Sequence, residues 1–406
     1  MDIEVGRFSG EARDFYTAAE IAFGTHAHDE DIAHFIATFE PDRAIAATEA
    51  GEIVGTAGAY SFAFSVPGAV VPAAGVTIVA VLPTHRRRGI LRRMMRHQLD
   101  DVHARGESLA ILWASEGGIY QRFGYGLASL HASIKLARDR AALRLPREPV
   151  GPVRLVNVAE ARQVFPAVHD AIAAHRPGFF ARSDAYWEHE FFPDPQHRRD
   201  GRSAAFDVVH ETNGAADGYA RYRIKDDWEH VGPNSSLVLV ELMAANPDAH
   251  VDLWTYLLGV DLIGQIEAWD QPVDDPLLLL VAEPRRLRAT VGDALWLRIV
   301  DVAGALEGRT YRSDGELVFD LGDEFCDWNA GTWSMTVQDG RARVVPSRAT
   351  AHIAFDVTDL AAAYLGAFSF AQLAAAGRAR EMAEGGIERA DALFRTDRAP
   401  WCPRVF

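Results

Sequence analysis

Six arginines crowd into one short stretch of an otherwise acidic chain. Residues 75–100 read GVTIVAVLPTHRRRGILRRMMRHQLD, whereas the 406-residue chain carries a formal net charge of −16. A loop that leads into a helix N-terminus presents unpaired backbone amides, which bind anions well. Gly89 lets a phosphate approach this backbone because it has no Cβ, and arginine side chains hold phosphate oxygens as bidentate forks. We therefore expect a cradle for a phosphorylated cofactor, with the loop cations Arg86, Arg87 and Arg88.

The arginines after Gly89 fall on a helix. At helical spacing the apolar residues of 91–102 share one face, and Arg93 and Arg96 lie on the opposite side. We expect a solvated helix face with an ion pair between Arg96 and Asp100. A general nucleic-acid surface is not expected, because such surfaces usually need a basic domain and this chain is acidic.

A tyrosine within the stretch SEGGIYQRFGYG could act as a general acid. A phenol has a pKa of about 10, so Tyr120 could hold a proton and donate it in general-acid catalysis. The alternative role for Tyr120 is aromatic packing, and the residues alone leave both interpretations open. We expect its neighbour Tyr125 to serve packing.

The chain ends in PWCPRVF. Chain ends usually fray, but this one is apolar and is stiffened by Pro400 and Pro403. We therefore expect the end of the chain to pack against the protein.

The elements that position these residues form three successive units. In the first, residues 11–23 show helical spacing, and 44–68 read as a hairpin around Ala50-Gly51. A buried strand at 76–81, a helix from residue 89 and a buried strand at 108–114 predict a right-handed crossover in a mixed sheet.

A second α/β unit spans about 150–285 and repeats this order of elements. We expect helices at 161–175, 183–192 and 250–263, and strands at 204–211, 217–226, 235–244 and 275–284. Its loop before the helix reads ANPDAH, without arginine or glycine, so this unit is expected to lack a phosphate cradle. From about residue 287, short strand-rich hairpins and helices predict an α+β unit.

Several further features limit the function classes. Cys326 and Cys402 have no metal-like spacing and are expected to be unpaired, which favours the cytoplasm. The segment THAHDEDIAHF, residues 25–35, is interpreted as an acidic loop that either rims an acceptor pocket or is merely solvated, and not as a metal site. We see no signal peptide and no run of about 20 apolar residues, so no membrane span is expected.

The stretch RRRGIL after VAV resembles the acyl-CoA pyrophosphate loop of GCN5-related N-acetyltransferases (GNATs), although Leu91 stands where the family pattern has Gly or Ala. Together with SEGGIYQRFGYG, the three-unit layout and PWCPRVF, it resembles the enhanced intracellular survival (Eis) acetyltransferase family. This resemblance implies an α/β (α+β) fold of two tandem GNAT-like domains, the second degenerate, followed by a sterol-carrier-like α+β domain. The implied domains are 1–135, which is catalytic, 136–287, which lacks the CoA loop, and 288–406.

The resemblance also implies the site. Acetyl-CoA is the implied cosubstrate, with no metal, and Val79 and Val81 would offer amides to the thioester carbonyl. Tyr120 would be the general acid, and the terminal carboxylate of Phe406 the general base. The implied cofactor-binding residues are Val79, Ala80, Val81, Arg86, Arg87, Arg88, Gly89, Ile90, Leu91, Arg92, Ser115 and Glu116.

The implied reaction is direct transfer of acetyl to a primary amine of an aminoglycoside or similar polyamine, by a cytoplasmic homohexamer. Two departures put this acceptor in question. Val405 stands where broadly active members have an acidic residue, and Trp113 is bulkier than the expected histidine. The alternatives are a lysine-type or other small amine as acceptor, or a non-catalytic lipid or small-molecule carrier built on the third unit.

Overall fold

The computed structural model describes residues 2–230 and 232–406. The chain divides into two compact units. The first comprises residues 1–129, 177–181 and 293–406, and the second comprises residues 130–176 and 182–292.

A seven-stranded sheet forms the first part of unit 1. Strands β4 and β5 are its parallel pair, and they are registered only from Ala73–Gly75 against Leu109–Ile111. Beyond Gly75 the two strands part, which opens a gap between them. The sheet order is β1 (Glu4–Arg7), β2 (Ile45–Glu49), β3 (Glu52–Val66), β4 (Ala69–Val81), β5 (Leu109–Trp113), β16 (Leu295–Ile299) and β6 (Gly126–Leu127).

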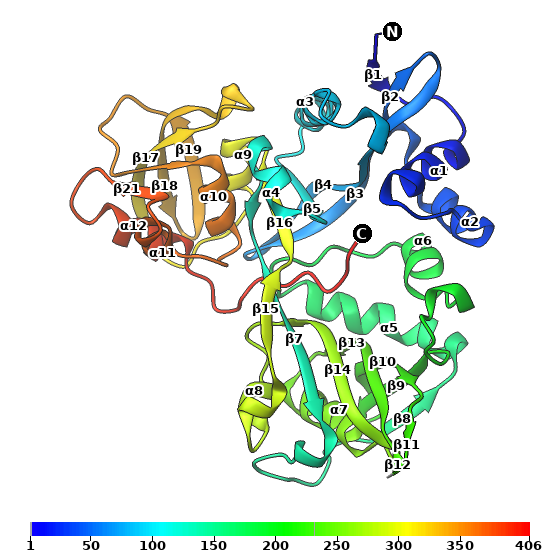
Figure 1. Cartoon of the computed structure of the whole chain (residues 1–406). Helices are drawn as coiled ribbons and strands as arrows, with labels where there is room; N and C mark the ends of the chain where they lie inside the picture. Colours follow the sequence, from blue (N-terminus) through cyan, green and yellow to red (C-terminus); the bar gives the residue numbers. More distant parts are fainter. Residues whose placement is uncertain (1, 231) are drawn as a thin grey trace. The chain divides into compact units, whose positions relative to one another are not determined.

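Helices cover both faces of this sheet (Figure 1). The long helix α3 buries Met94, Met95 and Leu99 against one face, and α1 and α2 pack Phe15 and Phe35 on the other. The expected first helix, the hairpin around Ala50-Gly51 and the strand-helix-strand crossover are therefore confirmed. The helices are α1 (Ala12–Phe23), α2 (Asp29–Thr38), α3 (Ile90–Ala104) and α4 (Gly117–Tyr120).

The expectation that the acidic residues of the segment 25–35 lie in a loop is wrong. Asp29, Glu30 and Asp31 form the first turn of α2. Carboxylates are favourable there because they face the positive end of the helix dipole. Arg13 also donates a hydrogen bond to Asp29 at 2.8 Å.

A five-stranded sheet with four helices completes unit 1 and confirms the expected α+β segment. Its strand order is β19 (Arg341–Pro346), β18 (Gly331–Gln338), β17 (Gly315–Gly322), β20 (Ile353–Asp356) and β21 (Ala379–Glu381). Its helices are α9 (Val302–Glu307), α10 (Val357–Tyr364), α11 (Phe370–Ala375) and α12 (Gly386–Phe394).

Unit 2 holds a second seven-stranded sheet. Its strand order is β15 (Thr290–Asp293), β7 (Leu130–Ala137), β14 (Ile263–Pro272), β13 (Ser235–Ala244), β10 (Ala215–Lys225), β9 (Phe206–Thr212) and β8 (Val153–Val156). The helices are α5 (Val158–Ala173), α6 (Asp184–Tyr186), α7 (Pro247–Gly259) and α8 (Leu277–Leu280), and a two-stranded ribbon joins β11 (Trp228–Glu229) to β12 (Gly232–Pro233).

The strand expected at 275–284 is wrong. The run of leucines forms the short helix α8, which begins after Pro276 and is held by the Asp275 carboxylate, an acceptor for the Leu277 amide at 2.7 Å. The strand that closes the parallel pair of this sheet is β14, which pairs with β13. Its sequence IGQIEAWDQP is too polar to read as a buried strand.

One strand of each large sheet comes from the part of the sequence next to the other sheet. Strand β7 follows the first sheet in sequence but pairs with β14 of the second, and β16 follows the second sheet but pairs with β5 of the first. Each compact unit is therefore built from segments that are not continuous in the sequence. In the described residues, no helix is long and apolar enough to cross a membrane, and no group of three or more His, Cys, Asp or Glu side chains could hold a metal ion.

Candidate active site

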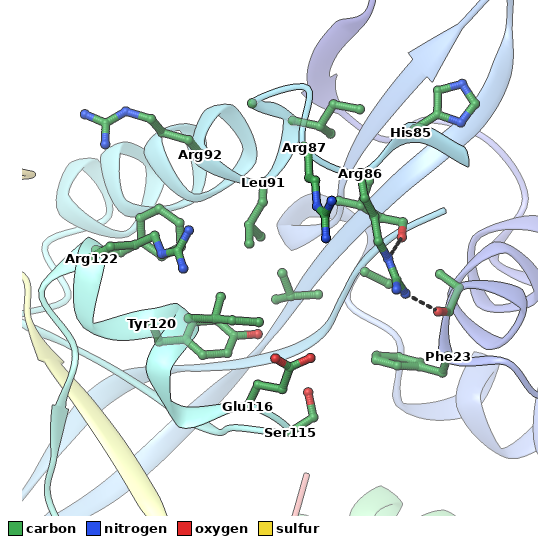
Figure 2. Close-up of a pocket in the computed structure, with 18 residues that line it drawn as sticks. Phe23, His85, Arg86, Arg87, Leu91, Arg92, Ser115, Glu116, Tyr120 and Arg122 are labelled. Atoms are coloured by element: carbon green, nitrogen blue, oxygen red, sulfur yellow. Dashed lines mark hydrogen bonds between the residues drawn. The ribbon is translucent and has the colours of Figure 1, made fainter. Parts of the chain in front are cut away.

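A cavity of about 580 Å³ lies where β4 and β5 part, in unit 1. Figure 2 shows the loop before α3 on one side of it and Tyr120 on the other. Twelve of the fourteen site residues predicted from the sequence line this cavity, and the two that do not are Arg88 and Phe406. The lining residues are Ala22, Phe23, Val79, Ala80, Val81, His85, Arg86, Arg87, Gly89, Ile90, Leu91, Arg92, Ser115, Glu116, Ile119, Tyr120, Arg122 and Phe123.

A β-bulge in β4 shapes the wall of the cavity. The register between β3 and β4 shifts at this point, and Ile78 has a positive φ of 44°. Thr56 fixes the bulge by donating its hydroxyl to the Ile78 carbonyl at 2.9 Å. The Leu82 amide donates a hydrogen bond to the Val54 carbonyl of β3 at 3.0 Å. Successive amides of a strand point in alternating directions. The amides of Val81 and Val79 therefore point away from β3, toward the gap.

The N-terminus of α3 is open. Gly89 is its N-cap residue, with φ 75°, and the described residues show no side-chain hydrogen bond that caps the helix there. Arg87 also has a positive φ, of 63°, and such left-handed residues in a turn form concave arrays of amides that bind anions. A Cβ on Gly89 would meet no atom of the described part of the chain within 4 Å. The residues present therefore fit the pyrophosphate of a CoA thioester, and the amides of 87–92 would hold it.

The three loop arginines differ in what their side chains do. Arg86 donates to the carbonyls of Ala22 at 3.0 Å and Val81 at 3.3 Å (Figure 2), so it ties the end of α1 to β4. Arg88 turns to Glu49 at 2.7 Å, which explains its absence from the cavity lining. Figure 2 shows Arg87 extending down into the cavity.

The loop is anchored through Glu49 at the end of β2. Its second oxygen lies 2.9 Å from Nε2 of His85, whose Nδ1 meets the Thr84 hydroxyl at 2.8 Å. The hydrogen bonds from Arg88 and His85 lower the pKa of Glu49 to about 2.

Tyr120 ends the short helix α4, and its hydroxyl faces the cavity (Figure 2). The side chain is 8% exposed, and burial raises its pKa to about 12. The phenol is therefore protonated throughout the physiological range and can act as a proton donor. Tyr125 is fully buried with its ring 5.8 Å from that of Tyr120, which fits the packing role expected for it.

The chain end packs, as expected. Trp401 and Cys402 are buried, and the Trp401 amide donates to Pro177 at 2.9 Å. The Phe406 ring makes edge contacts with Phe62 and Phe180, at centroid distances of 5.0 and 5.4 Å. The last residue thus lies against β3, and not in the lining of the cavity.

The face of α3 opposite the core is not simply solvated. Arg96 reaches Asp100 at 3.6 Å, as expected, but it also lies over the Phe325 ring at 4.1 Å and donates to the Phe325 carbonyl. Arg96 therefore docks α3 on the segment after β17. A local helical pattern could not reveal this partner, which is 229 residues away in sequence.

Six lining residues were missed by the sequence analysis. His85 and Arg122 stand inside the quoted motifs, so the motifs could have found them. Phe23, at the end of α1, gave no signal beyond its place on a helix. The full set is Ala22, Phe23, His85, Ile119, Arg122 and Phe123.

Comparisons with known proteins agree with this geometry. An acetyltransferase (GNAT) domain family matches residues 9–128, and a second family of the same description matches residues 178–299. The sterol carrier protein domain family matches residues 302–403. An N-acetyltransferase of Streptomyces avermitilis is 43% identical over 90% of both chains. The N-acetyltransferase Eis of Mycobacterium tuberculosis is 37% identical over 85% of this chain and 84% of its own.

This chain belongs to the Eis-like N-acetyltransferases of the GNAT superfamily. The crystal structure of Eis1 from Mycobacterium abscessus is similar to this chain over the full length of both chains, with a TM-score of 0.85 and 33% sequence identity. A GNAT from Anabaena variabilis gives the same TM-score at 20% identity and shows the fold alone. The predicted fold of two GNAT domains and a sterol-carrier-like domain is thereby confirmed, as is the enzyme class. Members of this superfamily use acetyl-CoA.

Proposed function

We propose that this Eis-like enzyme transfers acetyl from acetyl-CoA directly to a primary amine, in the cavity between β4 and β5. The observation that carries the proposal is the arrangement in Figure 2, where a buried tyrosine hydroxyl faces an uncapped helix N-terminus across that cavity. One end can hold phosphates, and the other can donate a proton to a leaving group. Acetyl-CoA supplies the thioester carbon that the amine attacks.

Backbone amides are the main proposed binding groups for acetyl-CoA. Those of residues 87–92 would hold the pyrophosphate, and those of Val79 and Val81 would accept the negative charge that develops on the thioester oxygen. Ser115 and Glu116 line the same cavity and would contact the cosubstrate from the β5 side.

Tyr120 is the proposed general acid. It would protonate the CoA sulfur as the C–S bond breaks. With a pKa near 12, the phenol gives up its proton less readily than a free tyrosine. The thiolate that develops in the same desolvated site has a raised proton affinity as well, which keeps the transfer feasible.

The terminal carboxylate of Phe406 is the proposed general base. A packed chain end supports this, because a base must be held at a fixed place to act. Gly178 makes that packing possible, since a Cβ there would lie 2.6 Å from the Trp401 carbonyl oxygen. The aromatic contacts of Phe406 with Phe62 and Phe180 then fix the last residue.

The acceptor is proposed to be a primary amine of an aminoglycoside or similar polyamine, or a smaller lysine-type amine. Val405 is 46% exposed and supplies no charge, and the indole of Trp113 is held by its Nε1, 3.4 Å from the Cys402 sulfur. Both features favour the smaller, less charged amine. The proposal also includes a cytoplasmic homohexamer, which rests on family resemblance alone.

A thiol-release assay with acetyl-CoA over a panel of amines tests the proposal. The panel contains aminoglycosides, linear polyamines and lysine derivatives, and the enzymes are wild type and a variant lacking Phe406. We expect CoA release with at least one amine and a loss of about 10²-fold or more in kcat without Phe406, the scale of general-base catalysis. A wild type that releases no CoA with any amine would overturn the proposed function and favour a carrier.

A further inference from the structure

We propose that Arg298, a buried residue of β16, positions the Tyr120 hydroxyl for the reaction. This inference rests on the proposed role of Tyr120 as general acid. Arg298 itself does not line the cavity, so it acts through the turn that carries the tyrosine.

The turn that carries Tyr120 is seated on β16 at both of its ends. It begins at Gly117, where a Cβ would lie 2.6 Å from the Trp296 ring, and it ends at Gly124, where a Cβ would lie 2.2 Å from the Arg298 guanidinium. Each glycine is therefore required by a specific side chain of one strand. The Trp296 ring is itself held by a hydrogen bond that its Nε1 donates to the Asp293 carboxylate at 3.0 Å.

Arg298 also contacts the backbone of the turn at its far end. Its Nη1 donates a long hydrogen bond of 3.5 Å to the Gly124 carbonyl. Gly124 has φ 83° and closes the turn through its amide, which donates to Gln121 at 2.9 Å. The next amide, of Tyr125, donates back to the Tyr120 carbonyl at 3.3 Å. A shift of the guanidinium would thus be transmitted to Tyr120 within one turn.

The guanidinium is held rigidly by a carboxylate of the sterol-carrier-like segment. Arg298 Nη2 lies 2.8 and 2.6 Å from the two oxygens of Asp323, and both side chains are 0–1% exposed. The Asp323 oxygens also accept from the Cys326 amide at 2.9 Å and from Asn329 at 3.1 Å. Asn329 is anchored by the Val302 amide at 3.1 Å.

A fully buried ion pair is an expensive way to stabilise a fold, because apolar side chains of similar volume do as well or better. A rigid guanidinium beneath Gly124 offers something apolar packing does not, which is a directional anchor for the turn. The sterol-carrier-like segment thereby contributes Asp323 to the positioning of the acid, separately from the chain end that it supplies.

The test is a double-mutant cycle on the full-length enzyme. The variants Arg298→Met and Asp323→Asn are made in wild type and in Tyr120→Phe, and kcat and KM for acetyl-CoA are measured. Asp323→Asn keeps the shape of the buried pair and serves where Arg298→Met fails to fold. The matched control is Arg182→Met, which breaks an equally buried pair with Glu241 in unit 2.

Because displacements of about 1 Å can cost about 100-fold, we expect kcat to fall about 10- to 100-fold in both variants, with KM within about twofold. In the Tyr120→Phe background the same changes should have almost no further effect on kcat. Arg182→Met should lower the melting temperature but leave kcat of the folded enzyme unchanged.

Two results would overturn the inference: kcat near wild type in Asp323→Asn, or an equal loss in the presence and absence of the Tyr120 hydroxyl. A different result bears on the proposed function. If Tyr120→Phe alone keeps wild-type kcat, the tyrosine is not the acid, whatever Arg298 does.

Discussion

The two GNAT units build the same strand-loop-helix and differ at the first turn of the helix. In unit 1 the N-cap residue of helix α3 is Gly89, which has no side-chain cap. In unit 2 the N-cap residue of helix α7 is Asn246, whose side chain accepts from the Ala249 amide at 2.9 Å. The first turn of α3 therefore has no capping side chain, whereas in α7 the Ala249 amide is already used by a side chain of the same segment.

Charge strengthens the contrast. Asn246 donates to Asp217 at 2.7 Å, and Asp248 lies in the first turn of α7. Negative side chains stabilise a helix N-terminus and repel a phosphate there. The corresponding loop of unit 1 carries Arg87 and leaves its guanidinium in the cavity.

The gap between the parallel strands differs as well. In unit 2, β13 and β14 stay paired from Ser235 to Leu239, against only three registered pairs between β4 and β5. A bulge persists beside Glu241 in β13, but this carboxylate is buried with Arg182 and accepts from the Tyr219 hydroxyl at 2.6 Å. A shared fold does not by itself carry a function. Under the proposed function, the difference between the units lies in the open N-terminus of α3 and the gap beside β4.

The largest effect should separate the tyrosines of the two units. Tyr120→Phe removes the proposed proton donor and should lower kcat about 10²- to 10⁴-fold with little change in KM for acetyl-CoA. Because burial raises the pKa of Tyr120 to about 12, the wild type should show no loss of the acid as pH rises through 10. Steady-state kinetics from about pH 6 to 10 measure both.

The matched control is Tyr219→Phe, which removes the buried hydroxyl that serves Glu241. It should lower stability by about 1–3 kcal/mol, since it leaves a charged acceptor with one partner fewer, and it should keep kcat. Equal losses of kcat in the two variants would contradict the division of labour between the units.

An intermediate effect should come from the anchor of the pyrophosphate loop. Glu49→Gln weakens the hold on both His85 and Arg88, so KM for acetyl-CoA should rise about 3- to 10-fold with kcat nearly unchanged. Because the pKa of Glu49 is lowered to about 2, its pair with Arg88 is complete above about pH 4.5 and is lost as pH falls toward about 2. The part of the KM effect that comes through Arg88 should therefore be constant across the neutral range.

Glu52→Gln, on the register partner of Glu49 in the same hairpin, provides the control and should leave KM unchanged. A rise of KM in Glu52→Gln as large as in Glu49→Gln would point to general surface charge and not to the loop.

The smallest effect is expected in unit 2. Asn246→Ala removes the cap of α7 and should cost about 1 kcal/mol of stability, the typical value for a helix N-cap. Because this helix holds no cosubstrate in our account, KM for acetyl-CoA should not change. Thermal unfolding and steady-state kinetics on the same preparation measure the two quantities, and a raised KM would show that unit 2 contributes to cosubstrate binding.

Much of the first unit could be predicted from sequence because its signals are local. The arginine loop, Gly89 and the apolar spacing of α3 lie within one short segment, and each has a direct physical meaning. The same holds for the uncapped helix N-terminus, since Gly at this position supplies no side-chain cap.

The remaining features depend on partners that are distant in sequence. No local pattern shows that Arg88 turns to Glu49, that Arg96 stacks on Phe325, or that β16 completes the first sheet. The leucine run at 277–280 misled because four apolar residues fit a buried strand as well as a helix. Pro276 and the Asp275 carboxylate decided the outcome.

The most direct test of the account is the binding of acetyl-CoA, measured by calorimetry on wild type, Gly89→Asp and Gly106→Asp. Both glycines have φ 75° and open space around a Cβ, so both aspartates carry the same backbone strain, but only the one at position 89 caps α3 and places a charge in the cradle. We predict one site per chain in wild type, unchanged affinity in Gly106→Asp, and a loss of about 100-fold or more in Gly89→Asp, about 3 kcal/mol. Two sites per chain, or wild-type affinity in Gly89→Asp, would contradict the account.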